Sequence, residues 1–167
     1  MKKMIVCAAV CVAAASAQAV VVNVDPSGPG YLGYMNVFEL PSNGGGYVFG
    51  SPWGTPDLTA TFDDGLHTLT LGANHINDPS PFWYTPSGGP GATGNKIMQA
   101  NLYHEVTDSY SGQTVTFEGT VLSNTFDSAH VGKLFIRDFA ADYSSSVDTF
   151  IDMNVGNFSF SLNTLAG

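Results

Sequence analysis

Apolar and polar residues alternate in short runs along most of the chain, and this period of two predicts an all-β protein. The clearest run covers residues 112–124, where Val115, Phe117 and Val121 fall on one side of the predicted strand. Residues 156–162 repeat the pattern with phenylalanines facing inward and serines facing water. No stretch keeps helical spacing for three turns, so the chain predicts strands throughout.

Further segments with alternating or mixed patterns predict the remaining strands, and two long Gly- and Pro-rich segments, 40–56 and 72–95, predict loops. The Asp63-Asp64-Gly65 turn predicts a hairpin. Residues 133–139 carry apolar side chains on both sides, which indicates that both faces are covered. The strand count predicts an antiparallel two-sheet β-sandwich of the jelly-roll type, forming one domain over residues 20–167. The other predicted strands are 20–24, 35–40, 47–49, 57–62, 66–71, 96–106 and 147–153.

The first nineteen residues have the three parts of a cleavable signal peptide. Lys2 and Lys3 precede an uncharged apolar run over 4–15, and Ala17-Gln18-Ala19 supplies a cleavage signal of small residues. The apolar run is shorter than the roughly 20 residues that a membrane span requires. The segment therefore predicts a secreted or cell-surface protein with no membrane insertion after cleavage, the alternative being an uncleaved N-terminal anchor.

Removal of this segment changes the chemistry of what remains. Both cysteines, Cys7 and Cys11, lie within it, so the mature chain has no disulfide and no thiolate metal site. The precursor has a net charge of −9, and after cleavage Lys96, Lys133 and Arg137 stand against all fourteen acidic residues. This balance excludes nucleic acid as a partner and favours neutral ligands such as sugars, or divalent cations. The alternative is that the acidity only keeps the protein soluble.

Aromatic residues in the predicted loops suggest a carbohydrate site. Indole and phenol rings offer apolar faces to the C–H groups of a sugar ring, and nearby amides hydrogen-bond its hydroxyls. The alternative is that these rings cap the sandwich and hold its loops in place. Residues 96–106 are also predicted to have a polar side with an aromatic residue at its centre. This side would line the groove in which a glycan lies; the alternative is that it is an ordinary solvent-facing side. The predicted ligand-binding residues are Trp53, Trp83, Tyr84, Asn95, Gln99, Asn101 and Tyr103.

The sequence gives weaker indications of catalysis or metal binding than of carbohydrate binding. The chain contains no nucleophile elbow, zinc-protease, phosphate-loop or dinucleotide motif. Glutamates could furnish the carboxylate pair of a polysaccharide-degrading enzyme, an alternative that depends on their separation. Three aspartates lie beside prolines in turns with free carbonyls, and they are candidates for a structural Ca²⁺. The glutamates are Glu39, Glu105 and Glu118, and the aspartates are Asp25, Asp57 and Asp78.

Four segments in the second half of the chain carry a resemblance to a known family: GNKIMQANLYHEV, GQTVTFEGTVLSN, KLFIRDFAADYSS and GNFSFSLNTL. They resemble strands of galactose-binding-like jelly-roll carbohydrate-binding modules. These modules occur in exported bacterial proteins, some of which bear C-terminal sorting tails. The resemblance covers roughly residues 31–167 and implies a glycan-binding jelly roll. The family pattern continues into further strands where this chain stops at Leu165-Ala166-Gly167, which predicts a C-terminally truncated sequence.

The leading hypothesis is therefore a non-catalytic carbohydrate-binding module that is exported and whose partner is a polysaccharide or other glycan. A structural or adhesive surface domain without a sugar ligand is the first alternative, and a glycan-degrading enzyme is the second.

Overall fold

The computed structural model describes residues 19–73, 76, 78–85, 92–107 and 109–166, and these residues form β-strands joined by turns and loops. Within these ranges the only helical element is a short 3-10 turn, η1 (Pro41–Asn43). The all-β prediction is confirmed, whereas the jelly-roll type stays a prediction. No helix in the described part of the chain is long and apolar enough to span a bilayer. Except for Ala19, the predicted signal peptide lies outside the described residues.

The described residues form two compact units, which we treat separately. The terminal unit combines residues 19–23 with residues 109–166, and the central unit lies within residues 24–107. That the chain folds as a single domain stays a prediction.

In the terminal unit, β9 (Thr114–Val121) is the middle strand of a three-stranded sheet. It pairs in parallel with β1 (Ala19–Asn23) and antiparallel with β12 (Gly156–Asn163). Val115 and Val121 are buried on one face of this sheet, as the alternating pattern predicts. Rings join this apolar face, because Phe117 lies 5.1 Å from Phe158 between ring centroids.

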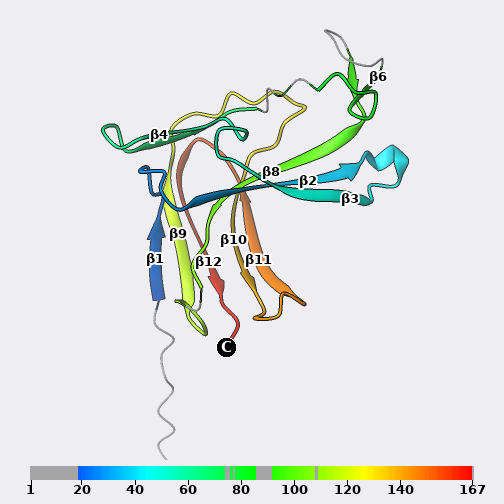
Figure 1. The fold of residues 1–167 in the computed structure, drawn as a ribbon. Helices are drawn as coiled ribbons and strands as arrows, with labels where there is room; N and C mark the ends of the chain where they lie inside the picture. Colours follow the sequence, from blue (N-terminus) through cyan, green and yellow to red (C-terminus); the bar gives the residue numbers. More distant parts are fainter. Residues whose placement is uncertain (1–18, 74–75, 77, 86–91, 108, 167) are drawn as a thin grey trace, which may run out of the picture. The chain divides into compact units, whose positions relative to one another are not determined.

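The terminal unit also contains a hairpin of β10 (Lys133–Phe139) and β11 (Ser146–Asp152), seen side by side in Figure 1. Leu134 and Ile151 pair on its half-buried side. The prediction that both faces of residues 133–139 are covered is wrong. Phe139 is 48% exposed and Phe150 is 38% exposed on the opposite side.

In the central unit, β2 (Tyr31–Glu39) lies between β3 (Tyr47–Trp53) and β8 (Lys96–His104), antiparallel to both (Figure 1). β3 extends beyond the predicted 47–49 to Trp53, which pairs with Gly33. The prediction of an irregular segment over 40–56 is therefore wrong for this part. The register shifts between Val37 and Phe38, so β3 contains a bulge at Val48.

One side of this sheet carries the core of the central unit. Met35, Val37 and Leu58 are buried, and Trp53, Trp83 and Leu102 pack against them. Gly33 is required at its position, since a Cβ there would clash with the backbone oxygen of Trp53 and would also lie 2.6 Å from a methyl group of Leu58. The loop carrying Leu58 leads into the predicted hairpin, which is present as β4 (Ala60–Asp63) and β5 (Thr68–Leu71). A small pair, β6 (Tyr84–Thr85) and β7 (Thr93–Gly94), precedes β8.

Candidate functional site

The sheet of the central unit has two chemically different sides. Side chains alternate across a strand, so the odd-numbered residues of β2 face the core and the even-numbered residues face away from it. We call the second side the amide face. Its members on the three strands are Leu32, Tyr34, Asn36, Phe38, Tyr47, Gly50, Pro52, Ile97, Gln99, Asn101 and Tyr103.

The amide face is uncharged and open to solvent in part. None of its eleven members is an acid or a base, although the chain as a whole is strongly acidic. Tyr47 is 60% exposed, Leu32 and Ile97 are also exposed, and the remaining large side chains are half-buried. Aromatic rings occur at both ends of β2 on this face, with Tyr103 opposite Leu32 and Tyr47 opposite Phe38.

Amide side chains occupy the middle of this face. Nδ2 of Asn36 donates a hydrogen bond to Oε1 of Gln99 over 3.3 Å. Nδ2 of Asn101 donates to the backbone oxygens of Tyr34 and Gln99, each at 3.1 Å. These bonds orient the three amides and do not involve Oδ1 of Asn36, Nε2 of Gln99 or Oδ1 of Asn101. The face therefore presents fixed amide donors and acceptors between aromatic rings.

Gly50 of β3 is the point at which three side chains of the amide face converge. A Cβ at this position would lie 2.7 Å from Cε1 of Tyr34, 2.8 Å from the hydroxyl of Tyr47 and 2.9 Å from Oδ1 of Asn36. A ring carbon, a phenol oxygen and an amide oxygen thus occupy the space that any other residue would fill. Glycine allows this close approach because it has no side chain.

The predicted site residues fall on both sides of the sheet. Gln99, Asn101 and Tyr103 share the amide face, as expected from the polar side of their strand. Trp53 and Trp83 pack together with the core on the other side. Nε1 of Trp53 donates to Oγ of Ser51 at 3.2 Å, and Nε1 of Trp83 donates to Oδ2 of Asp78 at 2.9 Å. The sheet thus separates the predicted tryptophans from Gln99 and Asn101.

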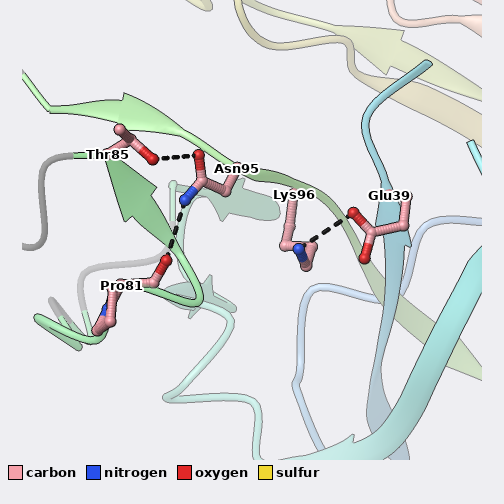
Figure 2. Close-up of polar contacts among 5 residues, drawn as sticks. All are labelled: Glu39, Pro81, Thr85, Asn95 and Lys96. Carbon is pink, nitrogen blue, oxygen red and sulfur yellow. Dashed lines mark hydrogen bonds and ion pairs between the residues drawn. The ribbon is translucent and has the colours of Figure 1, made fainter. Parts of the chain in front are cut away.

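Tyr84 and Asn95 belong to the loop region before β8. Tyr84 is half-buried in β6. The side-chain amide of Asn95 accepts a hydrogen bond from Thr85 at 2.8 Å and donates one to the backbone oxygen of Pro81 at 3.0 Å (Figure 2). Its backbone N–H donates to the backbone oxygen of Trp83 at 2.8 Å. Asn95 therefore uses both ends of its amide to hold this loop.

Eight of the eleven members of the amide face were not among the predicted site residues, and four of these eight carry an aromatic ring or an amide: Tyr34, Asn36, Phe38 and Tyr47. The alternation of Tyr34, Asn36 and Phe38 with buried Met35 and Val37 is visible in the sequence and could have indicated the first three. Tyr47 could not be assigned in this way, because the bulge at Val48 determines which side it faces.

The glutamates do not form a hydrolytic pair in the central unit. Glu39 pairs with Lys96 at one end of the β2–β8 ladder, with 3.1 Å between Oε2 and Nζ (Figure 2). Glu105 follows His104, which pairs with Tyr31 at the other end. The two ends are about 27 Å apart along the strand, whereas glycoside hydrolysis requires carboxylates separated by roughly 5–10 Å. Glu118 belongs to the terminal unit.

Each of the three aspartates considered for calcium accepts hydrogen bonds from residues of its own turn. Asp25 accepts hydrogen bonds from Oγ and N of Ser27 at 2.6 and 2.8 Å, and these bonds lower the pKa of Asp25. Asp57 accepts from the backbone of Gly54 at 3.1 Å, and Asp78 accepts from Ser80 as well as Trp83. Among the described residues, no three acidic, histidine or cysteine side chains gather where they could hold a metal ion.

Comparison of the chain with protein-family models, curated proteins and solved structures finds no match. The resemblance to galactose-binding-like modules therefore stays a prediction.

Proposed function

We propose that this chain is a non-catalytic binding module for a neutral polysaccharide, which it binds on the amide face of the central unit. The observation that carries the proposal is the combination of aromatic rings, of which Tyr47 is exposed and the others are half-buried, with oriented amides on one uncharged face. Sugar rings need both features, because their C–H faces stack on aromatic rings while their hydroxyls hydrogen-bond to amides.

The individual roles follow from the geometry. Cε1 of Tyr34 and the phenol oxygen of Tyr47 lie against Gly50, and these two side chains provide the central stacking surface and a hydroxyl beside it. Asn36 and Gln99 offer an acceptor and a donor beside those rings. Tyr103 extends the surface at the far end of β8. Because the face carries no charge, it favours neutral over acidic or basic sugars.

Export would bring such a module to its polysaccharide. The signal peptide predicted over residues 1–19 supports a secreted or cell-surface location. The galactose-binding-like jelly roll remains the fold to which we assign the module, on the basis of its strand motifs.

The experiment is affinity electrophoresis of the mature chain through gels that contain xylan, galactomannan or mixed-linkage β-glucan. We expect retardation in at least one gel, and Tyr47→Ala and Gln99→Ala should each weaken it about tenfold, the effect of losing one good contact. Leu66→Ala is the matched control, because Leu66 is 73% exposed in the β4–β5 turn of the same unit. Equal mobility with and without every polysaccharide would refute the proposal.

A second candidate is a structural or adhesive surface domain without a sugar ligand. It is favoured by the tryptophans, both of which pack against the core of the central unit instead of forming an open stacking surface. This candidate predicts that no polysaccharide retards the native chain, so the same gels distinguish the two.

A further inference from the structure

We infer that the outer side of the β10–β11 hairpin is a second polysaccharide-binding site, located in the terminal unit and built from different residues. We call it the hairpin strip. It consists of Phe135, Arg137 and Phe139 of β10, Tyr143 of the connecting turn, and Asp148 and Phe150 of β11.

The strip is an exposed row of aromatic rings. Phe135 and Phe150 pair across the hairpin with 5.8 Å between ring centroids, and Phe139 lies 5.5 Å from Tyr143. Tyr143 is 69% exposed, and Phe139 and Phe150 are also exposed. The side chains of the hairpin that pack inward lie on the opposite side, where Leu134 is half-buried. The rings therefore do not serve the interior of the hairpin.

An ion pair separates the two ring pairs. The guanidinium of Arg137 contacts Oδ2 of Asp148 through Nη2 at 2.8 Å and through Nε at 3.1 Å. The same guanidinium lies 5.9 Å from the ring of Phe139 and 5.6 Å from the ring of Phe150. The strip thus alternates apolar rings with a fixed polar group that has both donors and acceptors.

The turn presents Tyr143 in an unusual conformation. Its φ is 58°, in the left-handed region that non-glycine residues seldom adopt. Two backbone-to-backbone hydrogen bonds hold the turn: Tyr143 N donates to Ala140 O at 2.8 Å, and Ala140 N donates to Ser145 O at 3.0 Å. The result is that an exposed ring continues the row beyond the end of β10.

The size and charge of the hairpin strip indicate which kind of ligand it binds. Lys133 pairs with Asp152 at 2.7 Å and Arg137 pairs with Asp148, so the positive charges are compensated and the ligand is neutral. Seven residues per strand give a surface about 24 Å long and about 10 Å wide. This is roughly 240 Å², well below the roughly 800 Å² per partner of a specific protein interface. One extended polysaccharide chain fits such a narrow strip.

The test uses the mature chain in the same polysaccharide gels with a substitution that spares the fold. Tyr143→Gly removes the ring and suits the positive φ, so it should keep or raise the thermal midpoint. Combined with Phe139→Ala, it should weaken retardation at least about fivefold, the loss expected for aromatic contacts. Tyr143→Phe keeps the ring and is the matched control, which should bind as the native chain does.

The outcomes separate this inference from the amide-face proposal. If strip variants bind as the native chain does while Tyr47→Ala and Gln99→Ala each weaken binding about tenfold, the inference is overturned and the proposed function stands. If strip variants lose binding and amide-face variants do not, the hairpin strip is upheld and the amide face is not the site. If no gel retards the chain and the strip variant instead abolishes a concentration-dependent dimer, the strip is a self-association surface and the inference is wrong.

Discussion

Asn36 and Gln99 face each other across the β2–β8 ladder, and Nδ2 of Asn36 donates a hydrogen bond to Oε1 of Gln99 over 3.3 Å. The bond links neighbouring strands on the side of the sheet away from the core, where the side chains are only half-buried. It fixes the orientation of both amides, so that each keeps its remaining polar group in a defined place beside the tyrosine rings.

Loss of this amide pair should affect binding more than folding. A neutral hydrogen bond contributes about 0.5–1.5 kcal/mol, so Gln99→Ala should lower the free energy of unfolding by about 1 kcal/mol or less. Urea denaturation measures this loss, and the gel assay measures the binding. Asn36→Ala should give the same pattern, and the double variant should cost less stability than the sum of the two. Additive losses would show that the bond does not couple the residues.

Gly50 should tolerate no side chain. Gly50→Ala places a Cβ within 2.9 Å of groups from Tyr34, Tyr47 and Asn36, so these side chains must move. We expect a loss of stability of about 1–3 kcal/mol together with a loss of glycan binding. Gly46→Ala is the matched control, because a Cβ at Gly46 meets no atom within 4 Å. Equal urea midpoints for the two variants would contradict the convergence at Gly50.

The strands could be predicted from the sequence because alternation records which side of each strand is buried. Met35 and Val37 are fully buried, and the intervening Asn36 is on the other face. The same rule fails along β3. A period of two would put Tyr47, Phe49 and Trp53 on one face, whereas the bulge at Val48 moves Tyr47 to the amide face and leaves Trp53 with the core.

Bulges and ring packing depend on neighbouring strands, so the candidate site could be predicted only in part. Gln99, Asn101 and Tyr103 follow from the polar side of their strand. Nothing local in the sequence indicates that Trp83 reaches Met35 and Val37, or that the exposed rings of the hairpin strip are left uncovered, because both outcomes arise from contacts between distant segments.

Trp83 should be a structural residue. Its ring packs against Met35, Val37 and Leu58 and makes an edge contact with Phe82 at 4.6 Å between centroids. Trp83→Ala should lower the free energy of unfolding by about 2–3 kcal/mol, less than a fully buried ring would cost. Trp83→Phe should recover about half of that loss. Native-like stability of the alanine variant, coupled with lost glycan binding, would instead return Trp83 to the ligand site.

Stability at acid pH should depend on the turn at Asp142. Hydrogen bonds from the side chain and the backbone of Ser144 lower the pKa of Asp142 below its ordinary value of 3.8. The stabilisation is therefore present in full above the unfolded-state pKa and is lost as the pH falls through the lower pKa of the folded state. Ser144→Ala removes the larger contribution, so an NMR titration of the Asp142 carboxyl should show its pKa rising toward 3.8. Ser145→Ala, next to it, should leave that titration unchanged because the backbone bond from Ala140 to Ser145 remains. A curve that does not move in the Ser144 variant would show that the serine hydroxyl does not bond the carboxylate in solution.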